Sequence, residues 1–308
     1  MIEIFAESDS MREVIRLAQR VAATDANVLI TGESGSGKDA VAFHVHAKSR
    51  RSSQSFVKID CATLPSDLLE AELFGFERGA FTSATETKPG RLEAAHRGTL
   101  VLDEIAYLSV ESQAKLLRVI ESREFERLGG RRTIKVDARL LALTNVNLDQ
   151  AVSRKHFRED LYYRLNVVHI HLPPLRERSK DLPGLAQSFL KEYASKHGRQ
   201  VSGISPEALS LLKAYEFPGN VRELANTIER AVIISAGRRI EAADLPEAIR
   251  AAVQMQHRRK NPRSLAEVEA EYVADILLAA DGNKTEAARI LGISRKNLYE
   301  RLARLKKG

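Results

Sequence analysis

The chain of 308 residues is longer than one typical domain, which predicts roughly two or three domains of about 100 to 200 residues each. Hydrophobic residues make up 44% and charged residues 29% of the chain, as in soluble globular proteins, and no apolar run approaches the roughly 18 to 20 residues of a membrane span, which excludes a bundle of membrane-spanning helices. The net charge of +7 lies mostly after residue 256, where 12 Lys or Arg residues stand against 7 Asp or Glu residues.

The first 20 residues mix acidic and basic side chains in an amphipathic pattern and lack the apolar stretch of a signal peptide. Cys61 is the only cysteine, so the chain forms no internal disulfide, which is typical of a reducing compartment. The sequence therefore predicts a cytoplasmic protein that does not bind membranes.

Short apolar runs alternate with longer amphipathic stretches over residues 1–178, and the runs are "NVLITG", "FVKID", "TLVLDE" and "ARLLALT". This alternation predicts an α/β subdomain with a parallel sheet. Over residues 179–252 apolar residues recur at spacings of three and four, which predicts a second, all-helical subdomain. The polar, charged segment 253–263, which contains a proline, predicts a linker, and residues 264–308 form a predicted third unit.

The stretch "VLITGESGSGKD", residues 28–39, is a predicted strand that leads through a G-x-x-x-x-G-K loop into a predicted helix. This context is typical of a phosphate-binding loop, in which backbone N–H groups and the helix N-terminus face the phosphates and Lys38 reaches their β and γ oxygens. Asp39 stands where the common motif has Ser or Thr to hold magnesium. The predicted nucleotide-binding residues are Gly32, Glu33, Ser34, Gly35, Ser36, Gly37, Lys38 and Asp39.

The stretch "FERGAFTSATETKPG", residues 76–90, has neither helical nor strand periodicity, yet it contains an isolated aromatic residue, Phe81. A single aromatic residue on a loop more often folds back onto a core than projects into solvent. The local sequence alone therefore favours a packing role for Phe81.

The strand in "GTLVLDE" ends with two carboxylates, which after a phosphate loop indicate an ATPase. Asp103 is placed to hold magnesium, and Glu104 to orient or deprotonate the water that attacks the γ-phosphate. The next predicted strand ends at Thr144 and Asn145, polar residues suited to sensing that phosphate.

Three arginines follow in "FREDLYYRLNV" and "FPGNVREL", namely Arg158, Arg164 and Arg222. For any one of them, surface solvation or a salt bridge is the commoner explanation. A phosphoryl transition state nevertheless spreads negative charge that a planar guanidinium stabilises, so an ATPase needs at least one such residue.

The stretch "SLAEVEAEYVADILLAADGN" opens with a capping-box pattern at Ser264 and Glu267. "NKTEAARILGISRKNLYERLARLKK" then predicts a helix, a turn at Gly292 and a second helix, as in a helix-turn-helix. The side chains expected to face inward are Leu265, Val268, Tyr272, Ile276 and Leu277 on the opening helix and Leu298, Leu302 and Leu305 on the last one. Those placed to face a DNA groove are Arg295, Lys296, Asn297 and Arg301. The alternative is a plain helical hairpin whose basic excess is solvated.

Seven motifs in this order resemble the AAA+ activators of sigma-54 RNA polymerase, also called bacterial enhancer-binding proteins, from about Ser8 to Lys306. They are "GESGSGKD", "ELFGFERGAFTSA", "GTLVLDEI", "EFERLGG", "FREDLYYRLNV", "LPPLRER" and "FPGNVREL". The resemblance implies an AAA+ parallel-sheet P-loop domain with a helical lid, which binds ATP and Mg²⁺ and assembles as a ring of six or seven copies. The C-terminal unit resembles the Fis-like helix-turn-helix domain of these activators, which usually dimerises, and implies binding to upstream double-stranded DNA.

The resemblance also assigns roles to residues. It makes Lys38 a phosphate ligand, Asp103 the magnesium ligand, Glu104 the water activator and Arg222 the nucleotide-sensing arginine of the lid. Arg158 and Arg164 become arginine fingers that act on the neighbouring subunit. Residues 126–134 match the second pore loop. The family's sigma-54 contact loop, Gly-Ala-Phe-Thr-Gly-Ala, corresponds here to Gly79, Ala80, Phe81, Thr82, Ser83 and Ala84.

Three positions depart from the usual family pattern. Asp39 shortens an acidic residue that is usually Glu, and Ser83 replaces a Gly, which restricts the loop backbone. Asp60 replaces an Asn that restrains the catalytic Glu, and a carboxylate beside Glu104 is expected to repel it.

The sequence thus predicts an ATP-driven activator that remodels sigma-54 polymerase holoenzyme. A DNA-binding repressor that retains the nucleotide site is the alternative, favoured only by Ser83, and a remodeller of other proteins is disfavoured by the helix-turn-helix. Because the chain starts directly at the ATPase, control is expected from a separate partner or from an N-terminal domain outside this sequence.

Overall fold

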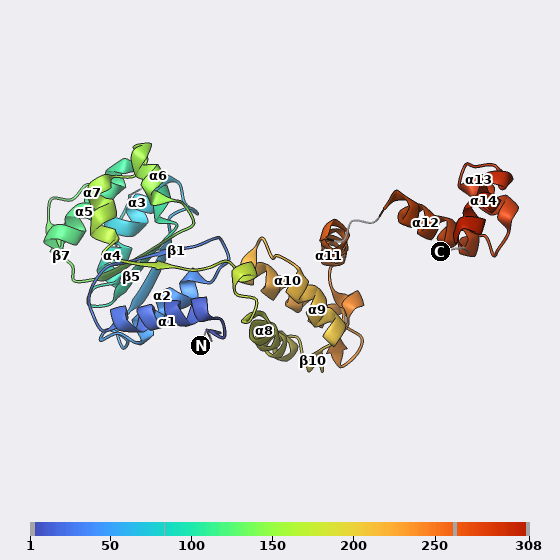
Figure 1. Cartoon of the computed structure of the whole chain (residues 1–308). Helices are drawn as coiled ribbons and strands as arrows, with labels where there is room; N and C mark the ends of the chain where they lie inside the picture. Colours follow the sequence, from blue (N-terminus) through green and yellow to red (C-terminus); the bar gives the residue numbers. More distant parts are fainter. Residues whose placement is uncertain (1–3, 83, 261–263, 306–308) are drawn as a thin grey trace. The chain divides into compact units, whose positions relative to one another are not determined.

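The structure is a computed structural model that describes residues 4–82, 84–260 and 264–305 (Figure 1). The chain forms two compact units, residues 1–246 and residues 247–308. Within the described ranges, no helix combines the length and the apolar composition that crossing a membrane requires.

A five-stranded parallel sheet forms the centre of the first unit, with the strand order β2-β5-β8-β1-β9. Four strands were predicted, and β9 was not, because its two apolar residues alternate with two histidines in a pattern too short to stand out. The strands are β1 (Val28–Thr31), β2 (Phe56–Asp60), β5 (Thr99–Asp103), β8 (Arg139–Thr144) and β9 (Val168–His171).

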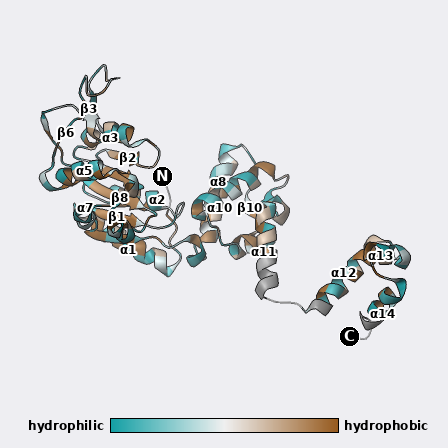
Figure 2. Cartoon of the chain, turned by 90° about the horizontal axis from the view of Figure 1, so that it is seen from above, coloured by the Kyte–Doolittle hydropathy of each residue, from teal (hydrophilic) through white to brown (hydrophobic). Residues whose placement is uncertain are grey.

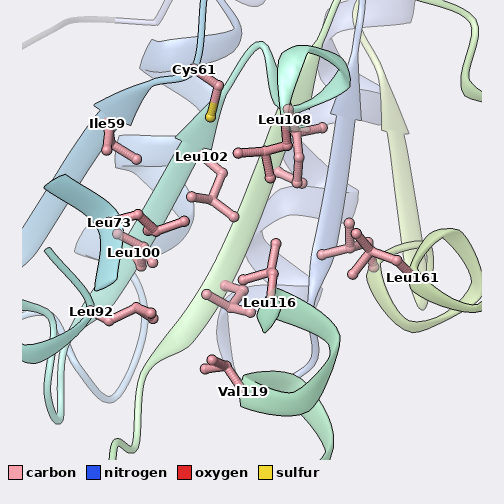
Figure 3. Packing of buried hydrophobic residues seen from close by; sticks show 14 of the residues in the cluster. Ile59, Cys61, Leu73, Leu92, Leu100, Leu102, Leu108, Leu116, Val119 and Leu161 are labelled. Carbon is pink, nitrogen blue, oxygen red and sulfur yellow. The ribbon is translucent and has the colours of Figure 1, made fainter. Parts of the chain in front are cut away.

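Helices cover both faces of this sheet, and hydrophobic residues concentrate on the strands between them (Figure 2). Because successive strand side chains point to opposite faces, Leu141 and Leu143 pack under α1 and α2, whereas Leu140 and Ala142 pack on the opposite side. Leu116 of α5 and Leu102 of β5 both belong to that second cluster (Figure 3). The helices are α1 (Asp9–Ala22) and α2 (Lys38–Ala47) on one face, and α3 (Ser66–Phe74), α4 (Arg91–Ala94), α5 (Val110–Ser122), α6 (Leu148–Ser153) and α7 (Glu159–Leu165) on the other.

One arginine is buried in this core. Arg139, 1% exposed at the start of β8, donates hydrogen bonds to Val21 O (2.9 Å) and Ala22 O (3.3 Å) at the end of α1. The last carbonyls of a helix lack partners within the helix and carry its negative partial charge, so a guanidinium is well suited to them. Arg139 thereby fixes α1 to the central strand.

Two short antiparallel pairs extend from the sheet. β3 (Gly75–Phe76) pairs with β4 (Lys88–Pro89) at the base of the predicted sigma-54 contact loop, and β6 (Glu124–Glu126) pairs with β7 (Thr133–Lys135) around the predicted second pore loop. Short 3₁₀ turns lie at Ile105–Tyr107 and Leu175–Glu177.

The segment after Leu175–Glu177 is mainly helical, with α8 (Leu182–Lys196), α9 (Pro206–Ala214) and α10 (Asn220–Ile234). The prediction of an all-helical subdomain was wrong in one detail: β10 (Gly203–Ile204) and β11 (Arg239–Ile240) form a two-residue parallel ladder. Such a pair is too short to show any alternation in the sequence. The α/β P-loop fold with a helical lid is confirmed, and the boundary at residue 178 stays a prediction.

The second unit contains α11 (Glu247–Lys260), α12 (Leu265–Ala279), α13 (Lys284–Ile290) and α14 (Arg295–Leu305). Helix α11 includes residues 253–260 of the predicted linker, because Gln, Met, Arg and Lys favour helix and polarity alone does not end one. The predicted capping box is present: Glu267 N donates to Ser264 Oγ (3.3 Å) and Ser264 N to Glu267 Oε2 (2.7 Å). The helix-turn-helix is also present, with Gly292 in the left-handed region (φ 67°) at its turn.

The predicted inward face of α12 was partly wrong. Val268 and Tyr272 are exposed, and Val273 is the buried residue, because the small core forms against the C-terminal half of α12. Ile276 and Leu277 pack against this core from α12, and Leu298 and Leu302 join it from α14 as predicted. The side chains of Leu265 and Leu305 lie outside the described part.

We expect Leu116→Ala to lower the free energy of unfolding by about 2 to 5 kcal/mol, since it empties a fully buried site in the sheet core. Leu68→Ala on α3 is the matched control, because Leu68 is 53% exposed and its removal leaves little void. Urea unfolding of the two variants measures the difference, and similar losses from both would contradict this core assignment.

Candidate nucleotide site and its surroundings

The phosphate loop follows β1 directly and ends at the start of α2. Gly37 precedes the helix in the left-handed region (φ 102°), and Lys38 is its first residue. The Lys38 ammonium is buried inside the loop, donates to Gly32 O (2.9 Å) and Glu33 O (3.3 Å), and lies 3.8 Å from Glu104 Oε1. Burial lowers the pKa of Lys38, and Glu104 opposes that shift. The loop thus wraps around the Lys38 side chain, and phosphate binding by its N–H groups stays a prediction.

The 3₁₀ turn Leu175–Glu177 and the helical segment after it contact this loop through paired side chains. Arg176 donates two hydrogen bonds to the Glu33 carboxylate (2.7 and 2.9 Å), and Asn220 Nδ2 donates a third (3.0 Å). The hydrogen bonds from Arg176, with that from Asn220, lower the pKa of Glu33 to about 2. Arg222 donates to Ser34 Oγ (2.9 Å), so this predicted residue lies at the loop. Arg176 and Asn220 were not predicted.

Close backbone contact explains one glycine of the loop. Gly35 has φ 73°, and a Cβ there would overlap the carbonyl oxygen of Gly219, just before α10. Val221 N also donates to Gly35 O (2.9 Å). A larger residue would push α10 away from the loop.

The two predicted carboxylates lie beside the loop at the end of β5. Glu104 has left-handed backbone angles (φ 52°, ψ 49°), and its Oε2 accepts from Asn145 N (3.2 Å) after β8. Asp103 Oδ2 contacts Lys58 Nζ at 2.7 Å, and the same ammonium contacts Asp39 Oδ1 at 2.5 Å. The structure therefore brings Lys38, Asp103, Glu104 and Asn145 together as predicted, and it adds Lys58.

Asp60 lies on β2 opposite Asp103 in the strand register. Its Oδ1 accepts a hydrogen bond from Ala62 N at 2.9 Å, while Glu104 contacts Lys38 and Asn145. The expected repulsion between Asp60 and Glu104 stays a prediction.

The donor set beside the loop suits Mg²⁺. No group of three or more His, Cys, Asp or Glu side chains is arranged around a metal position within the described residues. Mg²⁺ in nucleotide sites is typically bound by one or two carboxylates together with phosphate oxygens and water. Asp103 and Asp39 supply two such carboxylates. Both already contact one cation, the Lys58 ammonium group, so this position suits positive charge.

Two neighbouring cavities open at the loop. One of about 220 Å³ is lined by residues 34–39 with Asp103, Glu104 and Arg222. The other, of about 560 Å³, is largely apolar and is lined by Phe5, Val41, Leu185, Phe189 and others, with Arg178 among them. The buried Arg178 donates to Ser36 O, while its Nε has no hydrogen-bond partner among the described residues. The sequence did not reveal the second cavity, because apolar residues of this kind are indistinguishable from core residues in a sequence.

Arg158 is the N-cap residue just before α7, Arg164 lies in the last turn of α7, and both are paired with residues outside the loop. Arg158 forms two hydrogen bonds with Asp160 (2.8 and 3.0 Å) and lines a separate cavity of about 670 Å³. Arg164 pairs with Glu121 at 3.1 Å. Neither lines the cavity of the phosphate loop, in contrast to Arg222.

The predicted sigma-54 contact loop is a tight turn. Gly79 N donates to Ala84 O (2.8 Å) and Ala84 N to Phe81 O (3.0 Å), while Thr82 is exposed. Phe81 is 37% exposed, and its ring lies 4.9 Å from that of Phe76 at the base of the same loop. The aromatic ring therefore rests on its own loop and not in the domain core. Ser83 lies outside the described residues.

The second loop is joined to the first. Arg127 contacts Glu77 (3.0 Å) and Glu93 (2.7 Å), and both carboxylates raise the pKa of Arg127. Gly129, with φ 71°, packs so closely on Ala80 that a Cβ would lie 2.7 Å from the alanine methyl group. The two loops consequently share one salt-bridge network and one packing contact.

Helix α14 presents most of its predicted DNA-facing residues to solvent. Arg295, Lys296 and Asn297 are exposed in its first turn. Arg301 instead forms an ion pair with Glu269 of α12, which reduces its availability to a phosphate. The first turn is therefore the more accessible basic surface.

Comparisons with known proteins cover nearly the whole chain. Residues 4–171 match the family model of the sigma-54 interaction domain, residues 176–262 that of an AAA+ ATPase lid domain, and residues 264–305 that of the Fis family of bacterial regulatory proteins.

The chain is 46% identical over 307 residues to the regulatory protein AtoC of Escherichia coli K12, a match that covers 97% of this chain and 67% of AtoC. It is 47% identical over 309 residues to the transcriptional regulatory protein FlbD of Caulobacter vibrioides, covering 95% of this chain and 68% of FlbD. Among solved structures, it resembles NtrX from Brucella abortus in complex with ATP, with a TM-score of 0.78, 35% identity, and coverage of 99% of this chain and 70% of NtrX.

We expect Phe81→Ala to lower the free energy of unfolding by about 1 to 2 kcal/mol, since Phe81 is 37% exposed and packs on Phe76 outside the domain core. Phe74→Ala is the matched comparison, because Phe74 is 0% exposed and emptying its site is expected to cost about 3 to 5 kcal/mol. Urea unfolding distinguishes the two variants, and equal large losses would show that Phe81 belongs to the core.

Proposed function

Because this chain belongs to the sigma-54-dependent AAA+ transcriptional activators, we propose that it hydrolyses ATP as a ring and uses the energy to remodel sigma-54 RNA polymerase holoenzyme at promoters. The observation that carries the proposal is the cluster of Lys38, Asp103, Glu104 and Asn145 around a phosphate loop. NtrX, a similar protein, has been solved with ATP, which supports the choice of nucleotide.

The nucleotide would occupy both cavities at the loop. The apolar cavity of about 560 Å³ suits a purine base, and the smaller polar one suits the phosphates. Backbone N–H groups of the loop and the N-terminus of α2 would bind phosphate oxygens, and Lys38 would move from its loop carbonyls to the β and γ oxygens.

Hydrolysis requires a positioned water and stabilisation of the departing charge. Glu104, held by Asn145 N–H at the end of β8, accepts the proton of the attacking water. Asp103 would hold Mg²⁺, with Asp39 nearby, and the bound ion would neutralise charge on the phosphates. Arg222 contacts the loop from the lid, so it can report the nucleotide state to α10.

The remaining arginines fit action between subunits. Arg164 is exposed on α7, Arg158 is partly exposed just before α7, and neither lines this chain's own phosphate cavity. In a ring, each would reach the site of a neighbour and stabilise its transition-state charge. Their present carboxylate partners would then be exchanged for phosphate oxygens.

Contact with sigma-54 is assigned to the loop tip at Phe81 and Thr82. Both are accessible, and the loop rests on β3, β4 and Arg127 of the second loop. Conformational changes that start at the nucleotide site would reach the loop tip through the contacts between the two loops. A DNA-binding repressor that does not activate sigma-54 remains the second candidate, supported by Ser83 in place of the family's Gly.

Open-complex formation by the purified protein on a sigma-54 promoter with ATP tests the proposal. We expect open complexes with the unaltered chain and none with Phe81→Ala, which should keep its ATPase rate. ATP hydrolysis and DNA binding without open complexes would favour the repressor.

We expect Lys38→Ala to abolish ATP binding, whereas Glu104→Gln should bind ATP normally and lose hydrolysis by about 100- to 10,000-fold, the usual contribution of a general base. Lys38 contacts the phosphates and Glu104 the water, so the two changes act on different steps. Equilibrium binding of a fluorescent ATP analogue and phosphate release measure the two effects. Equal loss of binding in both variants would contradict these roles.

We expect Arg295→Ala and Lys296→Ala each to weaken DNA binding and to reduce the slope of log affinity against log salt by about 1, because each phosphate contact releases counterions. Arg301→Ala should have a smaller effect, since Arg301 is already paired with Glu269. Lys284→Ala is the control, because its ammonium lies over the Tyr299 ring at 4.8 Å. Binding that does not depend on salt would favour a plain helical hairpin.

A further inference from the structure

One lysine occupies the corner between the phosphate loop and the end of β5. Lys58 Nζ contacts Asp39 Oδ1 at 2.5 Å and Asp103 Oδ2 at 2.7 Å. Asp39 is the second residue of α2, and Asp103 is the last residue of β5. A single ammonium group thus connects the start of α2, which follows the phosphate loop, to the end of β5, where the two carboxylates lie.

The strand register explains how Lys58 reaches both. Lys58 on β2 stands opposite Val101 on β5, and in parallel strands aligned side chains point to the same face. Asp103 is two residues beyond Val101, on that same face, which is the face covered by α2. Lys58 therefore extends along the sheet surface toward the edge where Asp103 and the start of α2 meet.

The carboxylate oxygens of Asp39 and Asp103 that contact Lys58 also suit a divalent cation. Asp103 is mostly buried, so an unpaired charge there would be costly, and an ammonium group with three donors compensates it. An ammonium group and Mg²⁺ cannot both lie at 2 to 3 Å from one carboxylate oxygen without strong repulsion between the two cations. Lys58 and the metal consequently compete for Asp103.

We propose that Lys58 is a positioning residue that holds Asp39 and Asp103 in place of the divalent cation, so that the metal gains Asp103 only when it arrives with nucleotide phosphates. This inference rests on the proposed ATPase function. Without nucleotide, Lys58 lowers the affinity for free metal ions and keeps the two carboxylates oriented. With nucleotide, the phosphates supply further oxygen ligands, and the combined attraction displaces the ammonium from Asp103.

Titration of the nucleotide-free protein with Mn²⁺ alone, followed by electron paramagnetic resonance, tests the proposal. We expect Lys58→Met to bind Mn²⁺ at least about tenfold more tightly than the unaltered protein, since one competing cation is removed. Lys58→Gln should change in the same direction, which covers the case in which the methionine variant does not fold. Lys58→Arg keeps the cation and should stay close to the unaltered protein.

The matched control is Lys115→Met, because Lys115 also pairs with a carboxylate at 2.5 Å, that of Glu70, but lies on α5 at the other face of the sheet. It should leave Mn²⁺ affinity unchanged. Adding Asp103→Asn to Lys58→Met should abolish the gained affinity. Unchanged Mn²⁺ affinity in both Lys58→Met and Lys58→Gln, or a gain that survives Asp103→Asn, would overturn the inference.

ATP binding measured on the same proteins separates this inference from the proposed function. If neither the unaltered protein nor the variants bind ATP in the presence of Mn²⁺, the proposed function fails. If all bind ATP and the Mn²⁺ titrations are alike, only the role of Lys58 fails.

Discussion

The parallel register of three central strands determines where the chemistry lies. Strands β5, β8 and β1 are adjacent and aligned, with Thr31 opposite Thr144 and Leu102 opposite Ala142. Because parallel strands end at the same edge, the loop after β1, the carboxylates at the end of β5 and Asn145 after β8 converge at one place. The strongly apolar strands that maintain this register are therefore as necessary to the site as the polar residues that follow them.

Features contained in one contiguous motif could be predicted from the sequence. The phosphate loop, Asp103 with Glu104, and the capping box at Ser264 each combine a local pattern with a local structural requirement. Features that depend on two distant segments could not be predicted. Lys58 and Arg176 look like ordinary surface charges until the fold brings them to their carboxylate partners.

The remaining discrepancies have the same origin in tertiary packing. Periodicity places Val268 and Tyr272 on one face of α12, but only neighbouring helices decide which part of that face is covered, and here they cover Val273. For Phe81 the local sequence favoured packing, whereas the family resemblance implied an exposed loop tip. The residue is exposed at a loop tip, and its ring still contacts another aromatic ring. The ladder between β10 and β11 was missed because it consists of two residue pairs.

The bidentate pair between Arg176 and Glu33 has a consequence for how the lid can be released. Its carboxylate has a pKa of about 2, below the usual value of 4.5, so the stabilisation it gives is complete above pH 4.5 and declines only as the pH falls toward 2. Acidification within the range that cells experience would leave this ion pair intact. Both side chains are about two-fifths exposed, however, and dissolved ions weaken such a pair. This ion pair between lid and loop is thus sensitive to ionic strength and insensitive to mild acid.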